Sequence, residues 1–259
     1  MRTLPDTATV VQSGAACAAL DQASGLRRIF ERPPVSWTLD LQPSMRSASA
    51  PEALARRARQ LSASSGQTVI IDAARAQVAL PLGLRLRFDL EHALAGDCEL
   101  SAALVGAGES LWVLPAARAI DAALLDERHA LRVAAAFEAV AAGMRHAMLI
   151  LPASRVSWIR HLPALARTRE ALMPVAQRAD ASASVLTAVR QAMSEAEIDT
   201  FHLLFLGMGE AAAGRLLSGM AAIAQRHFGA TLLAARNVAQ TQPASAQAPA
   251  GDRSVEIGF

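Results

Sequence analysis

The sequence contains no lysine: all 25 basic residues are arginine. Tyrosine is also absent, and alanine makes up more than a fifth of the 259 residues. Arginine and alanine codons are rich in G and C, so mutational bias in a high-GC genome is the simplest origin of this composition. The absence of lysine nevertheless excludes the reactions and contacts that require a lysine side chain. The chain cannot form a lysine Schiff base with a substrate or a pyridoxal cofactor, and it cannot supply the lysine that a P-loop places on phosphates.

Cysteine is scarce, and no metal-ligand spacing is present. The two cysteines, Cys17 and Cys98, lie far apart, which favours two free thiols in a reducing compartment. The six histidines are scattered without HxH or HExxH spacing. The sequence therefore predicts no metal site.

Charge and long apolar runs are also limited. Charged residues make up 19% of the chain and the formal net charge is +2, so no direct nucleic-acid partner is expected. The first twenty residues lack the apolar region of a signal peptide. The most apolar long segment, 130–151, is interrupted by charged and titratable side chains, so it does not predict a membrane span. We therefore expect a cytoplasmic protein with no transmembrane segment.

Hydrophobic residues make up 53% of the chain, which is enough for one large domain with a buried core. Short apolar runs typical of strands alternate with segments of helical periodicity. This order predicts a single α/β domain built on a doubly wound, mostly parallel sheet. The predicted strands are 35–41, 68–72, 111–114, 147–151, 171–175, 201–206 and 231–235, and the predicted helices are 51–61, 124–143, 158–169, 182–193 and 210–228.

Two terminal segments lie outside this pattern. Residues 1–34 form an N-terminal segment with a short predicted helix, 21–30, that ends before the proline pair 33–34. The α/β domain covers 35–236. Residues 237–259 begin with an Ala-, Gln-, Pro- and Ser-rich stretch and are predicted to be disordered.

A ligand of a doubly wound sheet binds beyond the carboxyl ends of the strands. The loop after the first predicted strand, 42–49, contains neither glycine nor lysine, so it lacks the means to enclose a phosphate. Arg46 is its only cation, and Ser47 and Ser49 are better suited to cap the following helix than to bind an anion. Asp72 ends the second predicted strand without a second carboxylate nearby, and we interpret it as a cap for the loop near Arg75.

No catalytic group of residues emerges from the remaining sequence. Ser154 and Ser157 are not in a GxSxG elbow. Trp37, Trp112 and Trp158 lie in or beside apolar runs, which favours core packing over base stacking.

Two stretches together resemble a known family. Residues 21–28, Asp-Gln-Ala-Ser-Gly-Leu-Arg-Arg, resemble the DQAxxLR activator helix of the FlhG/FleN family, MinD-type ATPases that set flagellar number and placement. The stretches 69–73, 82–100, 111–116 and 201–229 are similar to the core of the same family. The resemblance implies a MinD-type (SIMIBI) P-loop fold and an N-terminal helix that docks on an FlhF-type, signal-recognition-like GTPase. The residues that it implies for this contact are Asp21, Gln22, Leu26, Arg27, Ile29 and Phe30.

The helix has a physical basis for such a contact. Leu26, Ile29 and Phe30 fall on one side and would form an apolar docking face. Asp21 and Arg27 would fix the register. A glutamine such as Gln22 can orient an attacking water during phosphoryl transfer.

The chain departs from the family at four elements that contact its nucleotide, although Asp72 matches the first carboxylate of the family's Asp-Ala-Asp strand end. The resemblance implies a glycine- and lysine-rich loop at 42–49, a second carboxylate at Ala74, an aspartate near Leu151 and an adenine-reading asparagine at Leu206. None of these residues is present. We therefore predict a degenerate nucleotide site made of Arg46, Ser47, Ser49 and Asp72, with no catalytic residues and without the family's ligand, ATP with magnesium.

These observations favour a non-ATPase regulator of flagellar biosynthesis, number or placement. It would act through an FlhF-type GTPase, with flagellar switch proteins or a flagellar transcriptional activator as further candidate partners that could bring it to the cell pole or flagellar base. Two alternatives stay open: an unusual MinD-type ATPase in which Arg46 and the backbone of 47–49 replace the phosphate loop, and an antiactivator of a flagellar transcriptional regulator.

Overall fold

The computed structural model of the chain describes residues 35–43 and 50–235. The chain divides into two units, Met1–Pro34 and Val35–Phe259, and every element described below belongs to the second. The predicted helix 21–30, the residues Arg46, Ser47 and Ser49, and the segment 237–259 lie outside the described residues.

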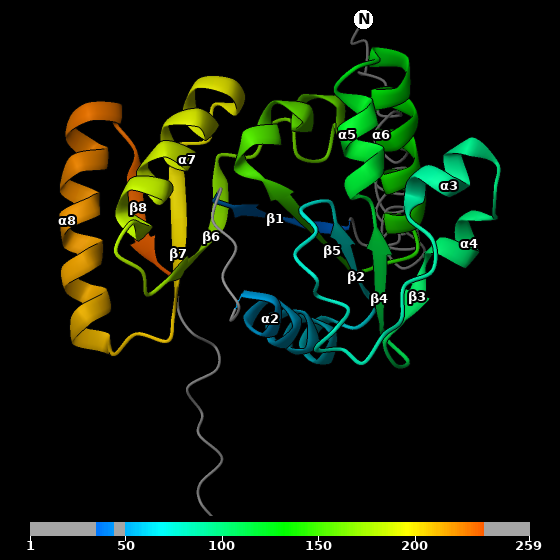
Figure 1. The fold of residues 1–259 in the computed structure, drawn as a ribbon, viewed down its shortest axis with the longest axis horizontal. Coiled ribbons are helices and arrows are strands. Elements are labelled where there is room, and N and C mark those ends of the chain that lie inside the picture. Colours follow the sequence, from blue (N-terminus) through cyan, green and yellow to red (C-terminus); the bar gives the residue numbers. More distant parts are fainter. Residues whose placement is uncertain (1–34, 44–49, 236–259) are drawn as a thin grey trace, which may run out of the picture. The chain divides into compact units, whose positions relative to one another are not determined.

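The centre of the domain is an eight-stranded sheet with the strand order β3-β4-β2-β5-β1-β6-β7-β8 (Figure 1). All neighbouring strands are parallel except β3 and β4, which are antiparallel. The prediction of an α/β fold with a mostly parallel sheet is confirmed. The strands are β1 (Ser36–Gln42), β2 (Thr68–Asp72), β3 (Val105–Gly106), β4 (Leu111–Pro115), β5 (His146–Pro152), β6 (Glu170–Ala176), β7 (Thr200–Leu206) and β8 (Thr231–Ala234).

Helices cover both faces of the sheet, and Figure 1 shows α2 across the strands from α5 and α6. The helical elements are α2 (Ala50–Ser65), α3 (Leu90–Ala95), α4 (Leu100–Ala103), α5 (Ala117–Ala123), α6 (Glu127–Ala141), the 3₁₀ helix η1 (Ala153–His161), α7 (Ala181–Ala196) and α8 (Glu210–Phe228). On one face, α2 packs against β2, β4 and β5. On the other face, α5, α6, η1, α7 and α8 form the larger core with the sheet.

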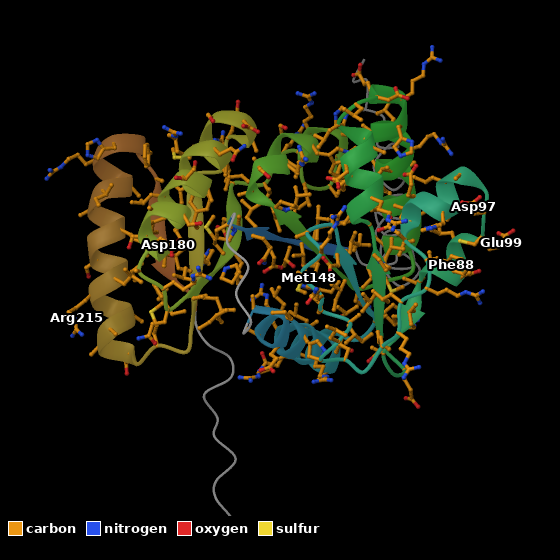
Figure 2. The ribbon with its side chains drawn as sticks, in the orientation of Figure 1. Phe88, Asp97, Glu99, Met148, Asp180 and Arg215 are labelled. Atoms are coloured by element: carbon orange, nitrogen blue, oxygen red, sulfur yellow. The ribbon has the colours of Figure 1, made fainter. Side chains whose placement is uncertain are left out.

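The strand β2 shows why the sequence predicts this layout. All five of its residues are buried. Val69 and Ile71 join the larger core, whereas Ile70 faces α2. A strand covered on both faces needs a continuous apolar run, which is what residues 69–71 provide. Met148 of β5 is also fully buried, on the face of the sheet that α2 covers. Figure 2 shows the opposite case, Arg215, whose side chain points outward from α8.

The predicted helix 158–169 is wrong. A 3₁₀ helix occupies Ala153–His161, and the chain continues through turns to residue 169. Pro163 explains the difference, because proline has no N–H and its ring clashes with the carbonyl group four residues earlier. Trp158 is nonetheless buried in the core as expected, and Trp37 and Trp112 are partly buried against the same core.

The segment between β2 and α6 contains short elements that the sequence pattern does not reveal, namely α3, α4, β3 and α5. Asp89 starts α3 by accepting a hydrogen bond from the Glu91 N–H, and Nδ1 of His92 accepts a hydrogen bond from the Asp89 N–H. Asp126 caps α6 in a similar way, so this helix begins at Glu127 and not at residue 124.

Within residues 35–43 and 50–235, no helix is both long and apolar enough to cross a membrane. The same residues contain no group of three or more His, Cys, Asp or Glu side chains able to hold a metal ion.

Candidate functional site

The candidate site is the edge of the sheet where the central parallel strands end. Gln42, the last residue of β1, is paired with Pro152 of β5. Asp72, the last residue of β2, is paired with Ile150, which precedes Pro152 on the same strand. The carboxyl ends of β1, β2 and β5 therefore lie side by side. This is the position at which ligands bind in doubly wound folds.

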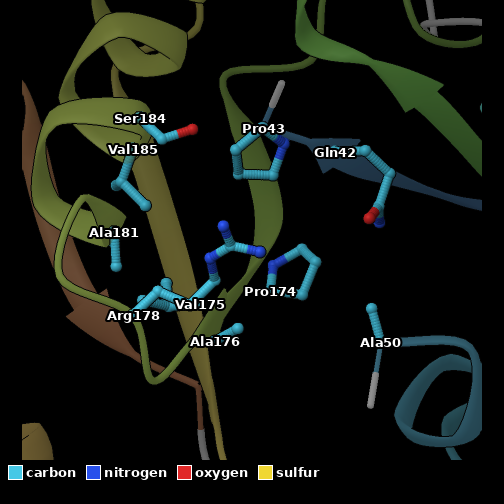
Figure 3. A pocket seen from close by; sticks show the side chains of 10 residues that line it. All are labelled: Gln42, Pro43, Ala50, Pro174, Val175, Ala176, Arg178, Ala181, Ser184 and Val185. Carbon is cyan, nitrogen blue, oxygen red and sulfur yellow. The ribbon is translucent and has the colours of Figure 1, made fainter. Parts of the chain in front are cut away.

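A small pocket lies between the ends of β1 and β6 and the start of α7 (Figure 3). Gln42, Pro43 and Ala50 line the pocket from the end of β1 and the start of α2, Pro174 lines it from β6, and Val185 of α7 lies on the opposite side. Its volume is about 20 Å³, which is room for about one water molecule.

Arg178 extends into the same pocket, so that its guanidinium lies near Pro43 and Pro174 in Figure 3. Its Nε lies 3.6 Å from Oδ1 of Asp180, which precedes α7. Both side chains are more than half exposed, so this ion pair contributes little to stability. Arg178 is a cation at the carboxyl edge that the sequence analysis did not single out.

Asp72 is the one member of the predicted degenerate nucleotide site that the structure describes. Its side chain is almost fully buried, and Oδ1 accepts hydrogen bonds from the N–H groups of Ala76 at 2.9 Å and Ala74 at 3.2 Å. Burial raises the pKa of the Asp72 carboxyl group, and the backbone N–H groups oppose that shift.

The backbone after β2 adopts a conformation that brings these N–H groups to Asp72. Arg75 and Gln77 have φ values of 53° and 57°, in the left-handed region that side chains other than glycine rarely occupy. The carboxylate of Asp72 thus holds a strained loop together. Its interpretation as a loop cap agrees with this geometry.

A second group of charges joins the loops after β2 and β5. Nη2 of Arg75 lies 3.0 Å from Oδ2 of Asp121 on α5, and Nη2 of Arg155 lies 3.6 Å from Oδ1 of the same carboxylate. This group was not predicted from the sequence. The sequence nevertheless contains a pattern that could have indicated it. Arg75 follows the end of β2 at Asp72 by three residues, and Arg155 follows the end of β5 at Pro152 by the same spacing.

The carboxyl edge therefore presents arginines, carboxylates that pair with them and a structural aspartate. Asp72 is occupied by backbone N–H groups, and Asp121 lies between two arginines. This arrangement is suited to holding loops together. Arg46, Ser47 and Ser49 lie outside the described residues.

No protein-family model and no curated protein sequence matches the chain. Solved structures do match. The ATP complex of McdA from Cyanothece superposes with a TM-score of 0.52 at 13% identity, covering 77% of this chain and 83% of that one.

The MinC–MinD cell division complex from Aquifex aeolicus gives a TM-score of 0.52 at 15% identity, covering 77% of this chain and 79% of that one. A ParA family ATPase from Chlorobium tepidum gives 0.52 at 12% identity, covering 77% and 82%. The chain has a MinD/ParA-type fold. Identities this low show the fold alone.

The segments that carry the family resemblance fall on definite parts of this MinD/ParA-type fold. Residues 69–73 cover the end of β2, residues 82–100 lead through α3, and residues 111–116 cover β4. Residues 201–229 contain β7 and α8. These segments build the sheet and the helices on it, whereas Ala74, Leu151 and Leu206 lie at or just after the carboxyl ends of β2, β5 and β7.

Proposed function

We propose that this chain is a regulator with a MinD/ParA-type fold that does not hydrolyse ATP and acts on flagellar number or placement through protein contacts. The observation that carries the non-hydrolytic part is Asp72, whose carboxylate is occupied by the N–H groups of its own loop. The segment at the phosphate-loop position of the sequence, 42–49, supplies no glycine and no lysine. A fold retained without these groups can still serve as a scaffold for partners.

The partner we propose is an FlhF-type GTPase that binds residues 21–30. Support comes from the resemblance of this segment to the family's activator helix and from its apolar side, Leu26, Ile29 and Phe30. Flagellar switch proteins and a flagellar transcriptional activator are the other candidate partners. Acceleration of GTP hydrolysis by an FlhF-type GTPase is the activity that tests the contact.

Titration with ATP tests the non-hydrolytic part. Isothermal titration of the full chain with ATP and magnesium is expected to give no heat of binding at micromolar concentrations, because no lysine meets the phosphates and Asp72 is already engaged. A MinD-type ATPase with an intact phosphate loop serves as the positive control. Micromolar binding that Arg46→Ala abolishes would overturn the proposal in favour of an ATPase with an arginine in its phosphate loop.

A further inference from the structure

The sheet has an open edge at β8. This strand is the last in the strand order, and among the described residues it pairs only with β7. The N–H groups of Thr231 and Ala235 donate to carbonyl groups of the neighbouring segment 199–203. Donors alternate along a parallel strand, so the N–H and C=O groups of Leu232 and Ala234 point away from β7. A row of such groups is a template for pairing with another strand.

Apolar side chains flank this edge on both faces of the sheet. Leu233 is 43% exposed. Leu232 belongs to the larger core, so Leu233 faces the other side, where α2 packs against β2, β4 and β5. On the side of α8, the side chains of Leu217, Ala221 and Phe228 are only partly buried. Parallel strands are ordinarily covered on both faces, so the described residues leave this end of the sheet incomplete.

The chain beyond β8 contains a segment that suits this edge. The described part of the chain ends at Ala235, directly after β8. In residues 255–259, apolar side chains alternate with Glu256 and Gly258, a period that is typical of a strand with one apolar face. The connection, 236–253, could span up to about 60 Å, several times the length of β8. The apolar residues are Val255, Ile257 and Phe259.

We propose that residues 255–259 pair with the free edge of β8 as an additional strand, with their apolar side chains on the face that α8 covers. This pairing gives the outward N–H and C=O groups of Leu232 and Ala234 their partners, and it covers the partly buried side chains of α8. The disorder predicted for 237–259 then applies to the Ala-, Gln-, Pro- and Ser-rich connection. The pairing does not depend on the proposed function.

Hydrogen exchange of the full chain, followed by NMR at single amides, tests the pairing. We expect the amides of Leu232 and Ala234 to exchange slowly, within about tenfold of the rates of Thr231 and Ala235, which donate to the β7 side. Without a strand at the edge, the outward amides have no acceptor among the described residues. Exchange of Leu232 and Ala234 more than about a hundredfold faster than that of Thr231 and Ala235 would overturn the proposal.

Variants identify the segment. Ile257→Asp places a charge among apolar side chains, so it is expected to speed the exchange of Leu232 and Ala234 at least about tenfold. Residue 257 lies outside the described core, so this variant should fold. The matched control is Glu256→Gln, on the other side of the same segment, and it should change these rates less than about twofold. Unchanged rates in Ile257→Asp, or equal changes in the two variants, would contradict the pairing.

Dilution distinguishes a segment of the same chain from that of a second copy. Pairing within one chain does not depend on protein concentration, so the protection of Leu232 and Ala234 should persist when the protein is diluted. Loss of this protection on dilution, together with a dimer at high concentration in light scattering, would assign the edge to a second copy and overturn the pairing within the chain.

Discussion

Replacing Phe137 by alanine is expected to lower the free energy of unfolding by about 3–5 kcal/mol. Phe137 lies on α6, is fully buried, and its ring meets the ring of Trp158 edge-on with centroids 5.2 Å apart. Truncation removes this contact and leaves a cavity between α6 and η1 that the surrounding core cannot fully close. Because domains of this kind are stable by only about 5–15 kcal/mol, the loss should be evident in urea denaturation.

The control for Phe137→Ala is Leu125→Ala. Leu125 lies between α5 and α6 and is 90% exposed, so its truncation should change stability by less than about 0.5 kcal/mol. A loss below about 1 kcal/mol for Phe137→Ala would contradict the packing described for α6 and η1.

Asp40 is expected to make stability depend on pH between about pH 4 and pH 6. Burial raises the pKa of Asp40 from 3.8 to about 6, and Arg57 opposes the shift only in part. In this window the native protein holds a proton on Asp40 that the unfolded chain has released. Linkage then lowers the Asp40 contribution to stability as pH rises, by about 3 kcal/mol across the full shift.

The variant Asp40→Asn removes this dependence, because asparagine does not titrate. The free energy of unfolding of the variant minus that of the native protein should increase by about 2 kcal/mol between pH 4 and pH 7, which is most of the full effect. Urea denaturation at several pH values measures this difference. Asp121→Asn, which alters an exposed carboxylate, is the control and should show a much smaller change. A difference for Asp40→Asn that does not vary with pH would show that Asp40 titrates normally.

Elements with strong local patterns were predictable from the sequence. The bounds of β2 and α8 agree with the predicted 68–72 and 210–228. In β2 the apolar run is continuous because both faces are covered. In α8 the helix ends at Gly229, whose φ of 75° provides the left-handed cap.

Features that depend on strand order were not predictable. Alternation along residues 35–41 favours a strand with one polar face, and such a face is usually exposed to solvent. In the structure β1 lies between β5 and β6 beneath the flank of α2, so Asp40 on that face is fully buried. No local signal indicates that Arg57 would lie beside it.

The candidate site also combines features that local sequence predicts with features that depend on strand order. The interpretation of Asp72 as a loop cap needed only the absence of a second carboxylate and the adjacent loop. The Arg75–Asp121–Arg155 group required knowledge that β2 and β5 are neighbours and that α5 returns to their ends. Contacts of this kind arise from tertiary structure, so sequence spacing does not reveal them.

The most direct test of the proposed function follows GTP hydrolysis by an FlhF-type GTPase with and without the full chain. We predict that the native protein accelerates turnover, that Gln22→Ala abolishes most of the acceleration, and that Gln225→Ala on the exposed side of α8 leaves it unchanged. No acceleration by the native protein would contradict the proposed contact, and equal acceleration by Gln22→Ala would contradict the role of Gln22 in it.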